Sequence, residues 1–213
     1  MRGFDQRTPW HRYDVWEHTV RTVENAPATE ILRLTMLLHD AGKPGSFTVD
    51  EKGVGHAYGH AARSAELARA ALTRLRVDND TRDAVLLLVS RHDVPLSPDW
   101  KTLRRRLNQF GEETLRRLID VRRADSLGKG TEPPADINAW AESMRAALDA
   151  LLATAPCVTL KQLAVSGSDL RALGLPPGPA LGACLNALLA RVVDGDLPND
   201  RAALLAAACS WRG

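Results

Sequence analysis

Apolar residues recur at helical spacing along almost the whole chain. The clearest stretch begins at Ile137, where Trp140, Met144 and Leu148 fall on one face. Apolar side chains that repeat every three or four residues are typical of an amphipathic helix with one buried face. The same periodicity predicts helices over residues 14–25, 28–40, 59–74, 79–91, 99–109, 111–127 and 199–210, and a further helix that ends near residue 195. We therefore expect an all-α fold.

Glycine and proline mark where several of these helices end. Gly42 and Pro44 follow the apolar segment 28–40, and helices usually stop before such residues. Residues 44–58 have little periodicity and are expected to form a long loop, of the kind that is often functional in compact domains. The run Val85–Val89 has the composition of a strand, but we interpret it as a buried helix because helical patterns flank it.

Residues 128–136 are rich in glycine, proline and polar side chains, which predicts a linker. Asp136, at its end, is suited to cap the helix that follows. Ser166 and Asp169 have the spacing of a capping box, so we expect a short helix to begin there. The linker divides the chain into an expected domain over residues 1–130 and a smaller helical region over 131–213, packed on it.

Composition and the length of apolar runs exclude several broad classes of protein. The formal net charge of +2 is too small to argue for nucleic-acid binding from bulk charge alone. The N-terminus has no apolar stretch of signal-peptide length, and no apolar run is long enough for a membrane span. Cys157, Cys184 and Cys209 have no CxxC spacing, so we expect reduced, buried thiols in a cytoplasmic protein.

Histidine and aspartate residues recur at the ends of the predicted helices or on faces that can turn inward. A lone helical histidine is more often an ordinary surface or core side chain than a ligand, but a helical bundle can build a metal site from side chains on separate helices. The candidate ligands are His18, His39, Asp40, His60, His92 and Asp125. Imidazole and carboxylate groups suit Mn, Fe, Co, Ni or Zn. We expect two divalent ions, with the carboxylate of Asp40 bridging them.

Three further residues are candidates for contacts with a phosphate. Lys43 follows the His39-Asp40 pair and is expected to neutralise phosphate charge, although a lysine there also fits the dipole of the preceding helix. His56 and Arg91 are weaker candidates for binding the substrate. His11 has no place in this constellation.

The order of these residues resembles the HD superfamily of metal-dependent phosphohydrolases, and His60 and His92 resemble its two-metal members. The closer resemblance is to the HD region and C-terminal part of bacterial tRNA nucleotidyltransferases, the CCA-adding enzymes. The similar segments are Tyr13–Thr19, Leu37–Pro44, His56–His60, Val165–Leu170, Leu173–Leu175 and Pro177–Pro179. The similarity extends from about Gln6 to Leu205.

The resemblance implies an HD-domain helical bundle over residues 1–130 that hydrolyses a phosphoester. It implies a 2′,3′-cyclic nucleotide phosphodiester or a nucleotide monophosphate as substrate, attacked by a water that two metal ions activate. Asp40 and Lys43 are the expected catalytic residues. The chain begins about a dozen residues before the first motif, so the nucleotide-transferring head of the CCA-adding enzymes is not expected in it, and hydrolysis is favoured over nucleotide addition.

A rival interpretation is a tRNA-binding HD or body module with little hydrolytic activity of its own. Arginines cluster on two successive predicted helices, at Arg104–Arg106, Arg116-Arg117 and Arg122-Arg123. In the resembling enzymes, the regions after the catalytic head engage tRNA. A solvated arginine-rich face explains the same pattern, and a metal-free remnant with a structural role is a third possibility. A steep dependence of RNA binding on salt would distinguish the RNA-binding interpretation.

Overall fold

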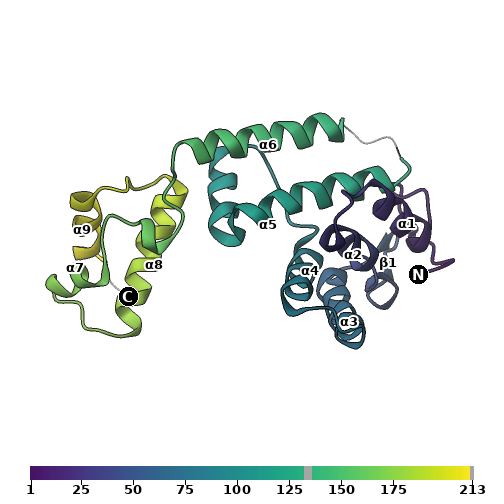
Figure 1. Ribbon diagram of the computed structural model, residues 1–213, viewed down its shortest axis with the longest axis horizontal. Coiled ribbons are helices and arrows are strands. Elements are labelled where there is room, and N and C mark those ends of the chain that lie inside the picture. The colour runs from purple at the N-terminus through teal and green to yellow at the C-terminus, as the bar shows by residue number, and fades with distance from the viewer. Residues whose placement is uncertain (132–135, 212–213) are drawn as a thin grey trace. The chain divides into compact units, whose positions relative to one another are not determined.

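The computed structural model describes residues 1–131 and 136–211, and over these ranges it confirms the all-α fold (Figure 1). The α-helices are α1 (Val15–Asn25), α2 (Glu30–Leu38), α3 (His60–Arg74), α4 (Asn79–Arg91), α5 (Trp100–Gly128), α6 (Ile137–Ala153), α7 (Gly167–Ala172), α8 (Pro179–Asp194) and α9 (Arg201–Cys209). Two short 3₁₀ helices, η1 (Lys43–Gly45) and η2 (Leu160–Gln162), and two short strands, β1 (Thr48–Val49) and β2 (Gly55–His56), complete the elements.

The chain forms two compact units. The first contains residues 1–95 and 113–145, and the second contains residues 96–112 and 146–213. Helix α5 therefore contributes to both, and its backbone is interrupted at Gly111, where φ is 73°. The sequence predicted a functional division between residues 1–130 and 131–213. The two units describe packing and do not test it, so this division stays a prediction.

Helices α1 to α4 pack together in the first unit. Helix α2 contacts α1, α3 and α4, and α3 also contacts α4. The run Val85–Val89 lies within α4, as predicted: Val85, Leu86, Leu88 and Val89 are buried, while Leu87 is 38% exposed. One exposed position within a buried run fits a helix, because its side chains point around the whole axis. Side-chain caps begin these helices; the carboxylate of Asp14, for example, accepts a hydrogen bond from the amide of Glu17 at 2.7 Å.

The long loop predicted over residues 44–58 is wrong in part. It contains η1 and a small antiparallel hairpin in which Thr48 pairs with His56 and Val49 with Gly55. The carboxylate of Asp50 organises the turn by accepting hydrogen bonds from the amides of Lys52 and Val54, both at 2.9 Å. Strands of two residues are too short to produce an alternating pattern, which is why the sequence did not indicate them.

The second part of α5 and the first part of α6 lie side by side in the first unit (Figure 1). Arg145 forms an ion pair with Asp120, and the guanidinium of Arg123 donates to the side-chain oxygen of Asn138 at 2.8 Å. Asp136 accepts a hydrogen bond from the amide of Asn138, so the predicted cap is confirmed. Part of the predicted linker, residues 132–135, lies outside the described residues.

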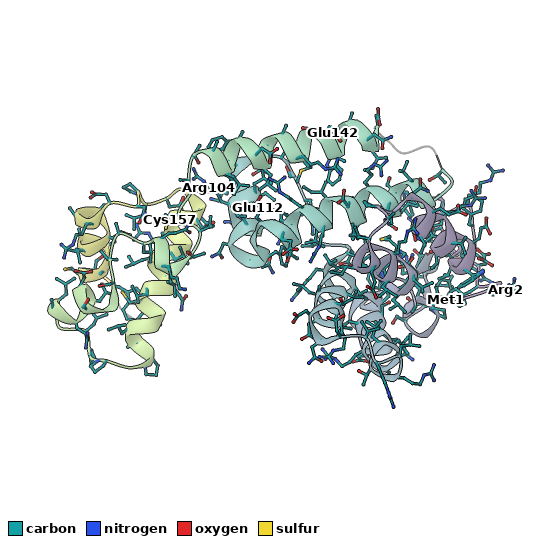
Figure 2. All side chains as sticks on the ribbon, in the orientation of Figure 1. Met1, Arg2, Arg104, Glu112, Glu142 and Cys157 are labelled. Carbon is teal, nitrogen blue, oxygen red and sulfur yellow. The ribbon has the colours of Figure 1, made fainter. Side chains whose placement is uncertain are left out.

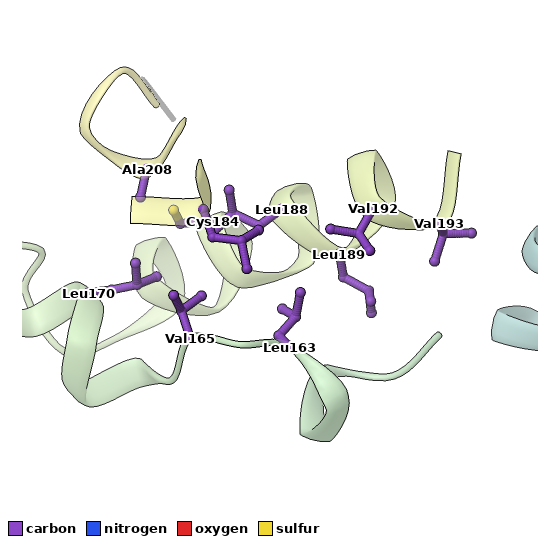
Figure 3. Packing of buried hydrophobic residues seen from close by; sticks show 10 residues of the cluster. Leu163, Val165, Leu170, Cys184, Leu188, Leu189, Val192, Val193 and Ala208 are labelled. Atoms are coloured by element: carbon purple, nitrogen blue, oxygen red, sulfur yellow. The ribbon is translucent and has the colours of Figure 1, made fainter. Parts of the chain in front are cut away.

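The second unit has its own hydrophobic core, formed by side chains of α7, α8, α9 and the segment around η2. Figure 3 shows Leu163, Leu170, Leu188 and Val192 among its members. The predicted capping box is confirmed, since Ser166 and Asp169 each bind the other's backbone amide. Figure 2 shows how side chains cover both units.

The three cysteines are free, but they are not all buried as expected. Cys184 is buried in the core of the second unit, Cys157 is half-buried and Cys209 is exposed. Cys209 is the last residue of α9, where a helix end meets solvent. Among the described residues, no helix is both long and apolar enough to cross a membrane.

Candidate metal centre

The His39-Asp40 pair lies in the turn that follows α2. Both side chains are fully buried, with Asp40 only 1% exposed. The next turn residue, Gly42, lies directly against the start of α3: a Cβ atom there would be 2.6 Å from the carbonyl oxygen of His60 and from the amide nitrogen of Ser64. Only glycine permits this approach. The contact brings Asp40 and His60 together from two helices.

Three histidines share one local arrangement. Each is placed at or beside the end of a helix, and each directs Nδ1 at the carbonyl oxygen three residues earlier. The distances are 2.7 Å from His39 to Met36, 2.9 Å from His60 to Ala57 and 2.7 Å from His92 to Val89. A carbonyl oxygen only accepts, so Nδ1 carries the proton and donates it. The second nitrogen, Nε2, is then directed at the centre and can bind a cation once it carries no proton.

Asp40 lies between two groups of histidines. Its Oδ2 atom is 3.3 Å from Nε2 of both His18 and His39, and its Oδ1 atom is 3.4 Å from Nε2 of His60 and 3.8 Å from Nε2 of His92. The ligand atoms of His18, His39 and Asp40 all lie within 4.8 Å of one another, as do those of Asp40, His60 and His92. One carboxylate thus faces both groups, which is the arrangement a bridging ligand needs.

Asp125 on α5 completes the cluster. Its Oδ1 atom is 3.1 Å from Nε2 of His18 and 3.6 Å from Nε2 of His39, and its Oδ2 atom pairs with Lys129 at 3.0 Å. Helix α5 approaches α1 closely at Gly128, where a Cβ atom would lie 2.4 Å from the methyl carbon of Thr22. The structure therefore brings all six predicted ligands together, from α1, α5 and the segments where α2 and α4 end and α3 begins.

The charges of the cluster are strongly coupled. Burial alone would raise the pKa of Asp40, but His39, Lys43 and His18 hold it well below its usual value. Burial alone would lower the pKa of His39, but Asp40 and Asp125 raise it to about 9. Burial, with His39 nearby, lowers the pKa of His92 to about 4. Without a metal, the centre therefore retains a proton on His39 while His92 is neutral.

The donor set fits divalent transition metals. Three buried atoms, Nδ1 of His18 and both carboxylate oxygens of Asp40, have no hydrogen-bond partner of regular geometry among the described residues. Buried polar atoms without partners are costly, and a cation would satisfy Oδ1 of Asp40, whereas Oδ2 already forms an ion pair with Lys43. Imidazole nitrogens together with carboxylate oxygens are the ligands that Mn, Fe, Co, Ni and Zn accept.

A cavity of about 410 Å³ opens onto the centre. Its lining includes Lys43, whose Nζ atom lies 2.7 Å from Oδ2 of Asp40 and 2.8 Å from the side-chain oxygen of Gln6. The lysine thus points at the centre, where it can meet a phosphate. His56 also lines the cavity, whereas Arg91 is exposed and is not among the lining residues.

Several lining residues were missed by the sequence analysis. His11 lies edge-on to His18, with ring centroids 5.2 Å apart, and burial followed by the charge of Lys43 lowers its pKa to about 3. It precedes the first helix, so no helical spacing linked it to His18. Trp10, Tyr58 and Lys129 also line the cavity and were missed, and so does Arg122, which the sequence analysis had assigned only to an arginine cluster. The sequence position of a single aromatic or cationic residue does not indicate which cavity its side chain will line.

Comparison with known proteins identifies relatives. The family model described as tRNA nucleotidyltransferase domain 2 matches residues 60–208. The A-adding tRNA nucleotidyltransferase of Deinococcus radiodurans is 32% identical over 84% of this chain and 42% of its own length. The CC-adding tRNA nucleotidyltransferase of Thermus thermophilus is 34% identical over 95% of this chain and 46% of its own length.

A multifunctional CCA protein of Azoarcus sp. is 31% identical over 57% of this chain and 31% of its own length. The chain thus spans less than half the length of these curated relatives. No solved structure matches it significantly.

Proposed function

The chain belongs to the tRNA nucleotidyltransferase domain 2 family, and on this premise we propose that it is the body region of a tRNA nucleotidyltransferase-type protein and that it binds tRNA. The observation that carries this proposal is the extent of the match. Residues 60–208 take in parts of both compact units, and the relatives from Deinococcus and Thermus align with most of the chain. The similarity is therefore not confined to the histidine motifs.

The arginine clusters of α5 support tRNA binding only in part. Arg105 is engaged by Asp194 through two hydrogen bonds of 2.6 and 2.9 Å, and Arg117 pairs with Glu113. Arg104 lies over the ring of Trp100, 5.7 Å from its centroid. A guanidinium beside an exposed aromatic ring suits the stacking and phosphate contacts of single-stranded RNA.

A salt-titrated binding measurement tests this proposal. If several phosphates are contacted, the logarithm of the association constant should fall linearly as the logarithm of salt concentration rises, by roughly 0.7 to 0.9 per phosphate. Binding to tRNA should also be tighter than binding to a DNA duplex of similar size. Equal affinity for both, or no binding at low salt, would contradict tRNA binding.

A second candidate function is metal-dependent hydrolysis of a phosphoester. One specific observation favours it: five buried or half-buried side chains, those of His18, His39, His60, His92 and Asp125, present ligand atoms around the buried carboxylate of Asp40. His18, His39, Asp40 and Asp125 would hold one divalent cation, and Asp40, His60 and His92 a second. Bound cations of this kind lower the pKa of water and neutralise charge on a phosphoryl group.

The protein's own residues have distinct roles in this proposal. Asp40 joins the two groups of ligands and fixes their separation. The Nδ1–H donations of His39, His60 and His92 keep the rings oriented, so that their Nε2 atoms stay directed at the centre. Lys43, held by Asp40 and Gln6, places a positive charge beside the cavity, where it stabilises negative charge on a bound phosphate.

A substrate panel tests this second function. We expect metal-dependent release of product from a 2′,3′-cyclic nucleotide or a nucleotide monophosphate, abolished by chelation and by Asp40→Asn. Asp83→Asn, on the exposed surface of α4, is the matched control and should retain activity. Full activity of the Asp40→Asn variant would contradict the assignment, as would activity that does not depend on metal.

A further inference from the structure

An aromatic pair, the exposed Tyr58 and the half-buried His56, lies on the wall of the cavity. Tyr58 is 79% exposed, yet its ring lies parallel to that of His56, with an interplanar angle of 6° and centroids 5.2 Å apart. Both residues line the cavity that opens onto the metal centre. Burial in the core does not account for this tyrosine, because most of its surface faces solvent.

His56 is held in place by the hairpin. It belongs to β2 and pairs with Thr48 of β1, and its Nε2 atom lies 3.0 Å from Oδ2 of Asp50. The other oxygen of that carboxylate is held by the amides of Lys52 and Val54. The Nδ1 atom of His56 is 3.4 Å from the hydroxyl of Tyr58. One face of the tyrosine ring is thus covered by a fixed imidazole.

The pair lies close to the centre along the chain and shares its cavity. Tyr58 precedes the ligand His60 by two residues, and Nε2 of His60 is 3.4 Å from Oδ1 of Asp40. Trp10, 61% exposed, lines the same cavity, as do the cationic side chains of Lys43 and Arg122. The cavity volume of about 410 Å³ falls in the range of small-molecule sites.

We propose that the stacked Tyr58–His56 pair is a platform for the base of a nucleotide whose phosphate reaches Lys43 and the Asp40 centre. The proposal rests on the second function above, phosphoester hydrolysis, and names the feature of the substrate that this chain selects. A flat aromatic face recognises any nucleobase, since every base has a π-face. The site therefore prefers phosphoesters that carry a base over those that do not, with little preference among bases.

Equilibrium binding by calorimetry tests the platform independently of turnover. The probes are adenosine 5′-monophosphate and ribose 5-phosphate, which differ by the base. We expect the wild-type protein to bind the nucleotide roughly tenfold or more tightly than the sugar phosphate, on the scale of a single base–aromatic stack. Tyr58→Ala should remove most of this difference by weakening nucleotide binding alone.

Two control variants sharpen the result. Tyr58→Phe keeps the ring and loses the hydroxyl, so it should retain the preference. Leu75→Ala removes an exposed apolar side chain that does not line the cavity and should leave both affinities unchanged. Equal binding of the two probes to the wild type, or an unchanged preference in Tyr58→Ala, would overturn the platform. Loss of the preference in Tyr58→Phe would overturn it as well, since the hydroxyl would then be the determinant.

Metal-dependent hydrolysis of ribose 5-phosphate separates this inference from the function on which it rests. If the sugar phosphate is hydrolysed and the base adds nothing to binding, the platform is wrong while hydrolysis stands. If neither probe is hydrolysed but the base-dependent binding disappears in Tyr58→Ala, the platform stands and the proposed chemistry is wrong.

Discussion

The Nε2 atoms of His60 and His92 face each other at 3.1 Å, although Nδ1 of each ring donates to a backbone carbonyl. When Nε2 of both rings carries no proton, the two lone pairs point at each other and neither nitrogen can donate. His60 and His92, with Oδ1 of Asp40, would hold a divalent cation that removes this repulsion. The local geometry of the two helix ends therefore favours a bound metal.

Metal addition should stabilise the protein through this pair. A cation at a hundred times its dissociation constant adds about 2.7 kcal/mol to the free energy of unfolding, which thermal unfolding detects as a higher Tm. His92→Gln should lose most of that increase, because one ligand is missing. His56→Gln lies outside the cluster and should keep it. An equal rise in Tm for wild type and His92→Gln would contradict this prediction.

Gly42→Ala should destabilise the first unit. The new methyl group would meet backbone atoms of His60 and Ser64 at 2.6 Å, and these cannot move without shifting α3. We expect a loss of roughly 1–3 kcal/mol in the free energy of unfolding, together with weaker metal binding. Gly182→Ala, in α8 with no atom within 4 Å of the new methyl group, should instead stabilise by roughly 0.5–1 kcal/mol. Denaturant unfolding of both variants measures the difference, and equal effects would contradict the close approach.

Metal uptake should release protons in the neutral range. The metal-free protein raises the pKa of His39 to about 9 despite its burial, because Asp40 and Asp125 lie beside it, so the imidazole is protonated at neutral pH. A cation must displace that proton, and the apparent metal affinity should rise with pH until about pH 9. Calorimetry in buffers of different ionisation enthalpy counts the protons. Identical heats in all buffers near neutral pH would show that no proton leaves.

The second unit should lose a stabilising interaction in acid. Hydrogen bonds from Ser166, with the guanidinium of Arg201, lower the pKa of Asp169 to about 2. A depressed carboxylate pKa contributes stability above its unfolded value and loses that contribution as pH falls. Wild type should therefore lose stability relative to Asp169→Asn as pH falls from about 4 to about 2. A difference between the two proteins that stays constant over that range would contradict this role.

The helices and the gathering of the cluster were largely predictable from the sequence. Helix caps such as Asp14 and helix-ending residues such as Gly42 act on their immediate neighbours, so a short stretch of sequence is enough to predict them. The four histidines and two aspartates of the cluster converge because helix ends project their side chains into one space. Whether they bind metal stays a prediction.

Other features depend on tertiary contacts that no short pattern encodes. The hairpin that positions His56 has strands too short for alternation. Tyr58 gains its role from a ring stacked beside it, and His11 joins the cavity through an irregular N-terminal segment. The break of α5 at Gly111 agrees with the two helices predicted over residues 99–109 and 111–127, but periodicity does not show that these two halves belong to different compact units.

Metal content tests the central claim most directly. Elemental mass spectrometry of the purified wild type, after incubation with divalent transition metals and removal of excess, should find one or two ions per chain. Asp40→Ala should retain none at the same concentration, while circular dichroism shows that it keeps its helices. A wild type that takes up no metal, or an Asp40→Ala variant that binds as much as the wild type, would contradict the assignment of this cluster as a metal centre.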